Sequence, residues 1–104
     1  MAKYLLAYTG GIQPETEEDG QAVMNAWIAW FGSLGPAVVD PGNPIGASAT
    51  VASDGSASAG GASGITGYSV VEADSLDAAT AIAQSCPHLA ANGAVEVYET
   101  FDVM

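Results

Sequence analysis

The only histidine of the chain, His88, is the residue best suited to acid–base chemistry near neutral pH, and it stands in the run Cys86-Pro87-His88-Leu89. A histidine titrates in this range, and a carboxylate beside it fixes the ring tautomer and increases its basicity. Asp40 is the candidate for that carboxylate, because it ends a short apolar run where a strand gives way to a turn. His88 and Asp40 therefore predict a general acid or base pair.

Both residues also have a purely structural interpretation. His88 can cap the carbonyl groups at the end of a predicted second helix, where a partly positive ring is favoured. Asp40 can bond the backbone of the turn that begins at Pro41. The sequence leaves these alternatives open.

Three aromatic residues are candidates for binding a substrate. Tyr8 and Tyr98 lie on predicted strands and can direct their hydroxyl groups into a cleft, although the sequence does not say which face of the sheet lines it. Trp27 can form a wall of the same cleft. Its helical spacing with Trp30 and Phe31 equally explains it as a core or dimer-contact residue.

Metal and redox chemistry are not indicated by the residue types or their spacing. One histidine and scattered carboxylates match no zinc site, and Asp54-Gly55 lacks the remaining ligands of a calcium loop. Cys86 is interpreted as a small buried residue, and a single cysteine suits a reducing compartment. We therefore expect no bound cofactor, no metal and a cytoplasmic location.

The charge balance restricts the partners. Twelve Asp and Glu residues stand against a single Lys3, and the formal net charge is -11. Nucleic acids and anionic membranes are bound through Lys and Arg, so we expect neither as a partner. The apolar run at residues 4–7 is too short for a signal peptide or a membrane span. Because only 12% of residues are charged and 49% are hydrophobic, few groups remain to solvate a monomer, which favours an oligomer.

Periodicity and turn residues divide the chain into two similar halves. Strands are predicted at residues 3–9, 37–39, 68–73 and 95–101. A first helix is predicted between the acidic cluster at residues 14–19 and Gly35-Pro36, with an inward face of Val23, Trp27, Trp30, Phe31 and Leu34. A second helix is predicted to be capped by Asp74 or Ser75 and to end before Pro87, with an inward face of Leu76, Ala79, Ile82, Ala83 and Cys86.

Residues 46–64 form a tract of Gly, Ser and Ala between the two halves. Such small side chains offset little of the ordering entropy of about 1 to 2 kcal/mol per residue. We expect a flexible hairpin loop, acting either as a plain linker or as a lid, with a short edge strand at residues 48–52.

The resulting order is β-α-β, long hairpin, β-α-β in one domain of residues 1–104. This predicts an α+β, ferredoxin-like fold with a four-stranded antiparallel sheet and both helices on one face. The other face, which carries apolar residues on several strands, needs cover. A second sheet packed face to face would supply it and enclose a cavity between two subunits.

Several runs of the sequence match one family. They are KYLLAYTGG at the N-terminus, the helix with Trp27 and Trp30, AVVDPGNP at residues 37–44, GYSVVEADSLDAA at residues 67–79, CPHL at residues 86–89 and VEV at residues 95–97. With these runs the chain resembles the YCII-related (DGPF-domain) proteins over nearly its whole length. The resemblance implies a bacterial protein with a dimeric α+β barrel, hence a homodimer with one cleft per subunit. It also implies a His-Asp pair in that cleft.

Two departures from the family pattern affect this pair. The hairpin has Asp54-Gly55-Ser56-Ala57 where some relatives have Asp-Gly-Pro-Phe, and the first helix has Met24-Asn25-Ala26-Trp27 where other relatives have a histidine. Only Asp40 matches the acidic position of the pair, since His88 belongs to a different motif.

The sequence thus supports two hypotheses. The first is a cofactor-independent lyase or isomerase, in which His88 and Asp40 move a proton on a small, apolar molecule in a dimer cleft. The second is a module without chemistry of its own, which binds a small molecule or serves in regulation or assembly.

Overall fold

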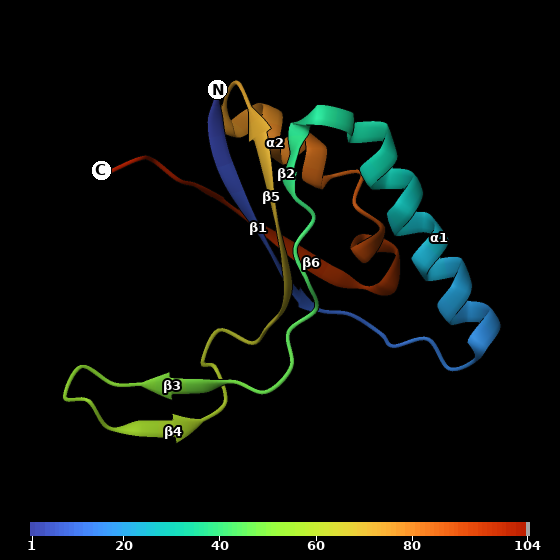
Figure 1. Ribbon diagram of the computed structural model, residues 1–104. Coiled ribbons are helices and arrows are strands. Elements are labelled where there is room, and N and C mark those ends of the chain that lie inside the picture. Colours follow the sequence, from blue (N-terminus) through green and yellow to red (C-terminus); the bar gives the residue numbers. More distant parts are fainter. Residues whose placement is uncertain (104) are drawn as a thin grey trace.

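The computed structural model describes residues 1–103. Its elements, shown in Figure 1, are β1 (Ala2–Gly10), α1 (Glu17–Leu34), η1 (Gly35–Ala37), β2 (Val38–Asp40), β3 (Ala49–Val51), β4 (Ala57–Ala59), β5 (Ile65–Ala73), α2 (Leu76–Ala83), η2 (Pro87–Ala91) and β6 (Gly93–Glu99).

The main sheet has four strands in the order β2-β5-β1-β6, and all neighbours are antiparallel. The first strand of the chain is therefore central: Leu6 of β1 lies opposite Ser69 of β5 on one side and opposite Val97 of β6 on the other. This confirms the predicted α+β, ferredoxin-like arrangement.

The core lies between the sheet and the helices. Alternation along β1 points Tyr4, Leu6 and Tyr8 to this side, and all three are buried. The remaining buried members of the cluster come from α1, β5, α2 and the turn after α2: Trp30, Val71, Ala73, Ala79, Ala83 and Cys86.

Helix α1 begins where the sequence provides a cap. Thr16 accepts a hydrogen bond from the Asp19 N–H at 3.0 Å, and three acidic residues in the first turn favour the positive end of the helix dipole. Gly35, with φ of 57°, ends the helix. No helix in the described part of the chain is long and apolar enough to cross a membrane.

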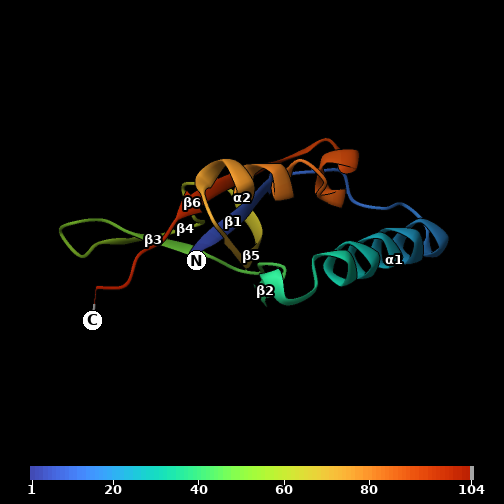
Figure 2. The same cartoon turned by 90° about the horizontal axis from the view of Figure 1, so that it is seen from above.

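Only the C-terminal half of α1 covers the core, since all the α1 residues that pack there lie between Trp27 and Leu34. Trp27, Phe31 and Leu34 pack against the core. The prediction that Val23 faces inward was wrong, since its side chain is 41% exposed beyond the covered region. Seen from above in Figure 2, α2 lies against the sheet, whereas α1 lies to one side.

Of the two predicted caps of the second helix, Asp74 and Ser75, the structure has Ser75, which accepts a hydrogen bond from the Ala78 N–H. The helix ends at Ala83, three residues earlier than expected, because tight turns lead into the short helix that begins at Pro87. Leu76 was predicted inward but is half exposed, as it occupies the first, uncovered position of the helix. Strand β6 ends at Glu99, so Phe101 lies beyond the sheet and is exposed.

Residues 49–59 form a separate two-stranded hairpin of β3 and β4, which projects from the body of the molecule in Figure 1. Side chains hold its backbone: the Thr50 hydroxyl donates to the Gly60 carbonyl at 2.6 Å, and Asp54 accepts from the Ser56 N–H at 2.8 Å. The hairpin makes no extensive contact with another element. The molecule is consequently flat, measuring 43 × 38 × 18 Å, and its radius of gyration of 15.1 Å exceeds the value of about 13 Å for a compact chain of this length.

Candidate active site around His88

His88 lies in η2, where it bonds the end of β1. Its Nε2 is 2.8 Å from the Thr9 carbonyl oxygen, and because a carbonyl only accepts, Nε2 carries the proton in this bond. In the neutral ring this leaves Nδ1 with a free electron pair. The bond thus selects the tautomer, a selection for which the sequence suggested a carboxylate.

Two glycines make room for this ring. A Cβ atom on Gly93 would lie 2.0 Å from Nε2 of His88, and one on Gly11 would lie 2.7 Å from Cε1. Gly11 also has φ of 100°, which side chains rarely tolerate. The imidazole therefore lies against the backbone of Gly11 and of Gly93. No larger residue fits at Gly93 while the ring stays in place.

The Nδ1 atom remains accessible. Within residues 1–103, every buried side-chain nitrogen or oxygen has a hydrogen-bond partner. The His88 ring bonds through Nε2. Nδ1 is therefore unpaired and not fully buried, as a group that exchanges protons with a substrate must be.

The His88 ring contacts one end of an aromatic cluster that is formed by side chains from β1 and α1. The Tyr8 ring centroid is 5.5 Å from that of His88, and Trp27 meets Tyr8 edge to face at 5.1 Å. Trp27 in turn contacts Trp30 and Phe31 at 5.7 Å. The structure thus brings together three residues that the sequence singled out, His88, Tyr8 and Trp27, and surrounds them with apolar surface.

The hydroxyl group of Tyr8 is tied to β5. It donates to Ser69 Oγ at 2.7 Å, and the Ser69 hydroxyl donates to the Pro41 carbonyl, also at 2.7 Å. Burial raises the pKa of Tyr8 well above its ordinary value of 10.0, and the hydrogen bond between Tyr8 and Ser69 only partly opposes this rise. Burial likewise raises the pKa of the Cys86 thiol, against the opposing effects of the His88 N–H and the Tyr8 hydroxyl. Both groups therefore stay protonated at neutral pH.

The raised pKa of Tyr8 predicts an alkaline loss of stability. Below pH 10 the residue is protonated in both the folded and the unfolded chain, so it adds no pH dependence. Above about pH 10 the unfolded chain releases the phenolic proton while the native state retains it, so the free energy of unfolding falls as the pH rises. Urea unfolding between pH 8 and pH 11 should show this fall, and Tyr8→Phe should reduce it. An unchanged slope in Tyr8→Phe would mean that Tyr8 ionises as easily in the folded protein.

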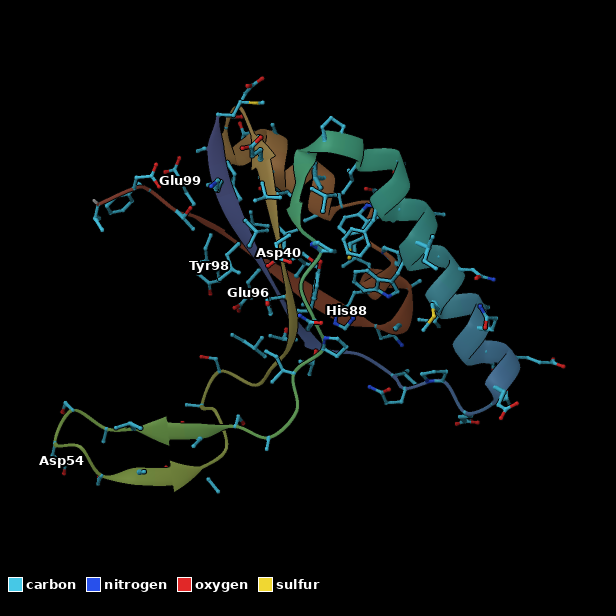
Figure 3. The ribbon with its side chains drawn as sticks, viewed as in Figure 1. Asp40, Asp54, His88, Glu96, Tyr98 and Glu99 are labelled. Carbon is cyan, nitrogen blue, oxygen red and sulfur yellow. The ribbon has the colours of Figure 1, made fainter. Side chains whose placement is uncertain are left out.

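Asp40 and Tyr98 lie apart from this group, as Figure 3 shows. Asp40 is exposed at the end of β2, and its Oδ1 accepts from the Gly42 N–H at 2.9 Å. Tyr98 lies opposite Leu5, on the sheet face away from the core, and donates to Glu96 at 2.8 Å. Among the described residues no hydrogen bond joins Asp40 to His88.

Sequence reasoning missed Ser69 and the two glycines. Ser69 alternates with Val71 and Ala73 on the buried face of β5, and a hydroxyl at such a position is a signal, because buried polar groups need partners. Gly11 and Gly93 gave no comparable signal, since glycines beside turns are common.

Other parts of the described chain offer less chemistry. No three His, Cys, Asp or Glu residues of residues 1–103 come together as a metal site. A hollow of about 490 Å³ lies at the base of the β3–β4 hairpin, between Ile45, strand β3, residues 61–64 and Ile65. A second, of about 320 Å³, lies between the two termini. Neither includes His88.

Comparison with known proteins gives one match. The model of the YCII-related domain matches residues 4–103. No curated protein and no solved structure matches the chain.

Proposed function

The chain belongs to the YCII-related domain family, and from this premise we propose that it is a cofactor-independent enzyme of the lyase or isomerase kind, which moves a proton on a small, largely apolar molecule. One observation carries the proposal. The Thr9 carbonyl holds the proton of His88 on Nε2, and Nδ1 is left unpaired and not fully buried. An imidazole fixed in one tautomer is a suitable general base near neutral pH.

The reaction needs only His88 as the proton carrier. Nδ1 takes a proton from a C–H bond of the substrate, whose electron pair stays on the substrate. The imidazolium then returns the proton to another carbon, which is an isomerisation, or to a departing group, which is an elimination. Tyr8 and Trp27 supply an apolar wall. Because Lys3 is the only cationic side chain, a strongly anionic substrate is disfavoured.

A homodimer forms part of this proposal. The sheet face opposite the helices carries Leu5, Tyr68, Val70 and Tyr98. Tyr98 is half exposed and the other three are partly exposed. A flat subunit with such a face is suited to pairing with a second copy. Light scattering at micromolar concentration and moderate salt should give the mass of two chains. Salt matters, because a charge of -11 on each subunit opposes association until it is screened.

The alternative is a binding module without chemistry. Its support is the position of the hollow at the hairpin base, which is lined by small and aliphatic residues and lies away from His88. A ligand held there would need no acid or base.

Solvent deuterium exchange tests the two proposals without knowledge of the substrate. A panel of small neutral ketones, lactones and unsaturated carbonyl compounds is incubated with the protein in D₂O, and the loss of C–H signals is followed by NMR. The enzyme proposal predicts exchange in at least one compound, its absence in His88→Gln, and wild-type rates in Asp77→Asn on the surface of α2. Saturation-transfer signals from a bound compound without any exchange would contradict the enzyme and support the binding module.

A further inference from the structure

Asp40, Pro41 and Gly42 form a turn that lies against β5 directly after β2. We propose that Asp40 is a positioning residue for Tyr8, acting through the Pro41 carbonyl and Ser69 rather than through its charge on His88. The role in catalysis rests on the function proposed above, whereas the structural link from Asp40 to Tyr8 does not.

The first step is the turn itself. Oδ1 of Asp40 accepts from the Gly42 N–H at 2.9 Å, which closes an Asx turn around Pro41. Proline fixes its own φ, and Gly42 has φ of 75°. The turn is pressed closely onto β5, because a Cβ atom on Gly42 would lie 1.7 Å from the Tyr68 carbonyl oxygen. Few other conformations are open to this segment while Asp40 keeps its bond.

The second step is the direction of the hydrogen bonds. The Pro41 carbonyl can only accept, so the Ser69 hydroxyl donates to it. Ser69 Oγ is then the acceptor for the single proton of Tyr8. Since both protons are committed, the buried Tyr8 hydroxyl is held in one direction, toward Ser69 on β5.

The third step connects this chain to the proton carrier. The Tyr8 ring lies against the His88 ring at 5.5 Å and against Trp27 at 5.1 Å. Loss of the bond to Ser69 frees the ring to move and leaves a buried hydroxyl without its acceptor. Asp40 thus reaches the His88 site through three hydrogen bonds, although it makes no bond with His88.

The proposal makes the geometry of Asp40 decisive and its charge dispensable. Asp40→Asn keeps an oxygen that can accept from Gly42, whereas Asp40→Ala does not. If Asp40 acted instead through a charge pair with His88, Asp40→Asn would lose the effect of Asp40. Asp54 provides a matched control, because it makes the same kind of turn bond to the Ser56 N–H at the hairpin tip, where nothing connects it to Tyr8.

The experiment follows the Tyr8 hydroxyl proton by NMR in protein labelled with ¹³C-tyrosine, at neutral pH. Asp40→Ala and Ser69→Ala should exchange this proton with water about tenfold faster than wild type, and Asp40→Asn and Asp54→Ala should keep the wild-type rate. If Asp40→Ala does not fold, Asp40→Ser, which makes a weaker form of the same turn, should give an intermediate rate. A wild-type rate in Asp40→Ala, or a fast rate in Asp40→Asn, overturns the proposal.

The deuterium assay separates this inference from the proposed function. Turnover should fall in Asp40→Ala and be retained in Asp40→Asn. If the wild-type protein exchanges no C–H group, the enzyme proposal fails, while the hydroxyl measurement still decides whether Asp40 positions Tyr8.

Discussion

Replacing Gly93 by alanine is expected to displace the His88 ring, to abolish proton transfer and to lower the free energy of unfolding by about 1 to 3 kcal/mol. The new Cβ would lie 2.0 Å from Nε2 and 2.3 Å from Cδ2 of His88, far inside van der Waals contact. The ring can rotate away more easily than β6 can move. The Thr9 bond, and with it the choice of tautomer, should therefore be lost first.

Nitrogen-15 NMR of the imidazole measures this outcome, because the two ring nitrogens give different shifts in each tautomer. The wild-type protein should show a proton on Nε2, and Gly93→Ala a mixture of tautomers. Gly32→Ala is the control, since a Cβ there meets nothing within 4 Å and the change should stabilise α1 by about 0.5 to 1 kcal/mol. A single Nε2–H tautomer retained in Gly93→Ala would show that the glycine is not needed for the position of the ring.

Replacing Gly42 by alanine should have the largest effect on stability, a loss of about 2 to 5 kcal/mol. Two costs combine. A φ of 75° costs an alanine about 1 to 2 kcal/mol, and the Cβ would lie 1.7 Å from the Tyr68 carbonyl oxygen. This oxygen belongs to the backbone of β5, so it cannot rotate aside, and relieving the overlap costs about 1 to 3 kcal/mol more.

Urea unfolding of Gly42→Ala and Gly35→Ala separates the two costs. Gly35 has a similarly positive φ of 57°, but a Cβ there meets nothing within 4 Å. Gly35→Ala should therefore show the conformational strain alone. Equal losses in the two variants would mean that the turn moves away from β5 at no cost, and the close approach of Gly42 to Tyr68 would then have no energetic importance.

The order of strands and helices could be predicted because local signals mark it. Alternation in β1, the Ser75 cap and the turn at Gly35 each depend on residues close together in sequence. The sequence could not predict how much of a helix the neighbouring elements cover. Val23 continues the apolar spacing of Trp27 and Phe31, yet it is exposed because the helix runs past the body that would cover it.

The candidate site was predictable in its residues but not in their partners. Tyr8, Trp27 and His88 were selected by type, and all three meet. The acceptor for His88 is a carbonyl 79 positions away, on β1. The sequence offered two interpretations of His88, a pair with Asp40 and a cap on the second helix. Neither involves the Thr9 carbonyl, because the sequence does not distinguish one backbone carbonyl from another until the fold is known. The turn interpretation of Asp40, in contrast, follows from Asp-Pro-Gly itself, and the bond to Gly42 agrees with it.

The central position of β1 affects how the protein folds during translation. This strand leaves the ribosome before its partners, which begin only at Ile65 and Gly93. The ladder with β6 continues to a bond between the Thr100 N–H and the Lys3 carbonyl. During most of translation β1 is an apolar segment with both edges unpaired, which is a template for aggregation. Chains interrupted before β6 should therefore be cleared or shielded by chaperones, because the sheet cannot close until β6 has been made.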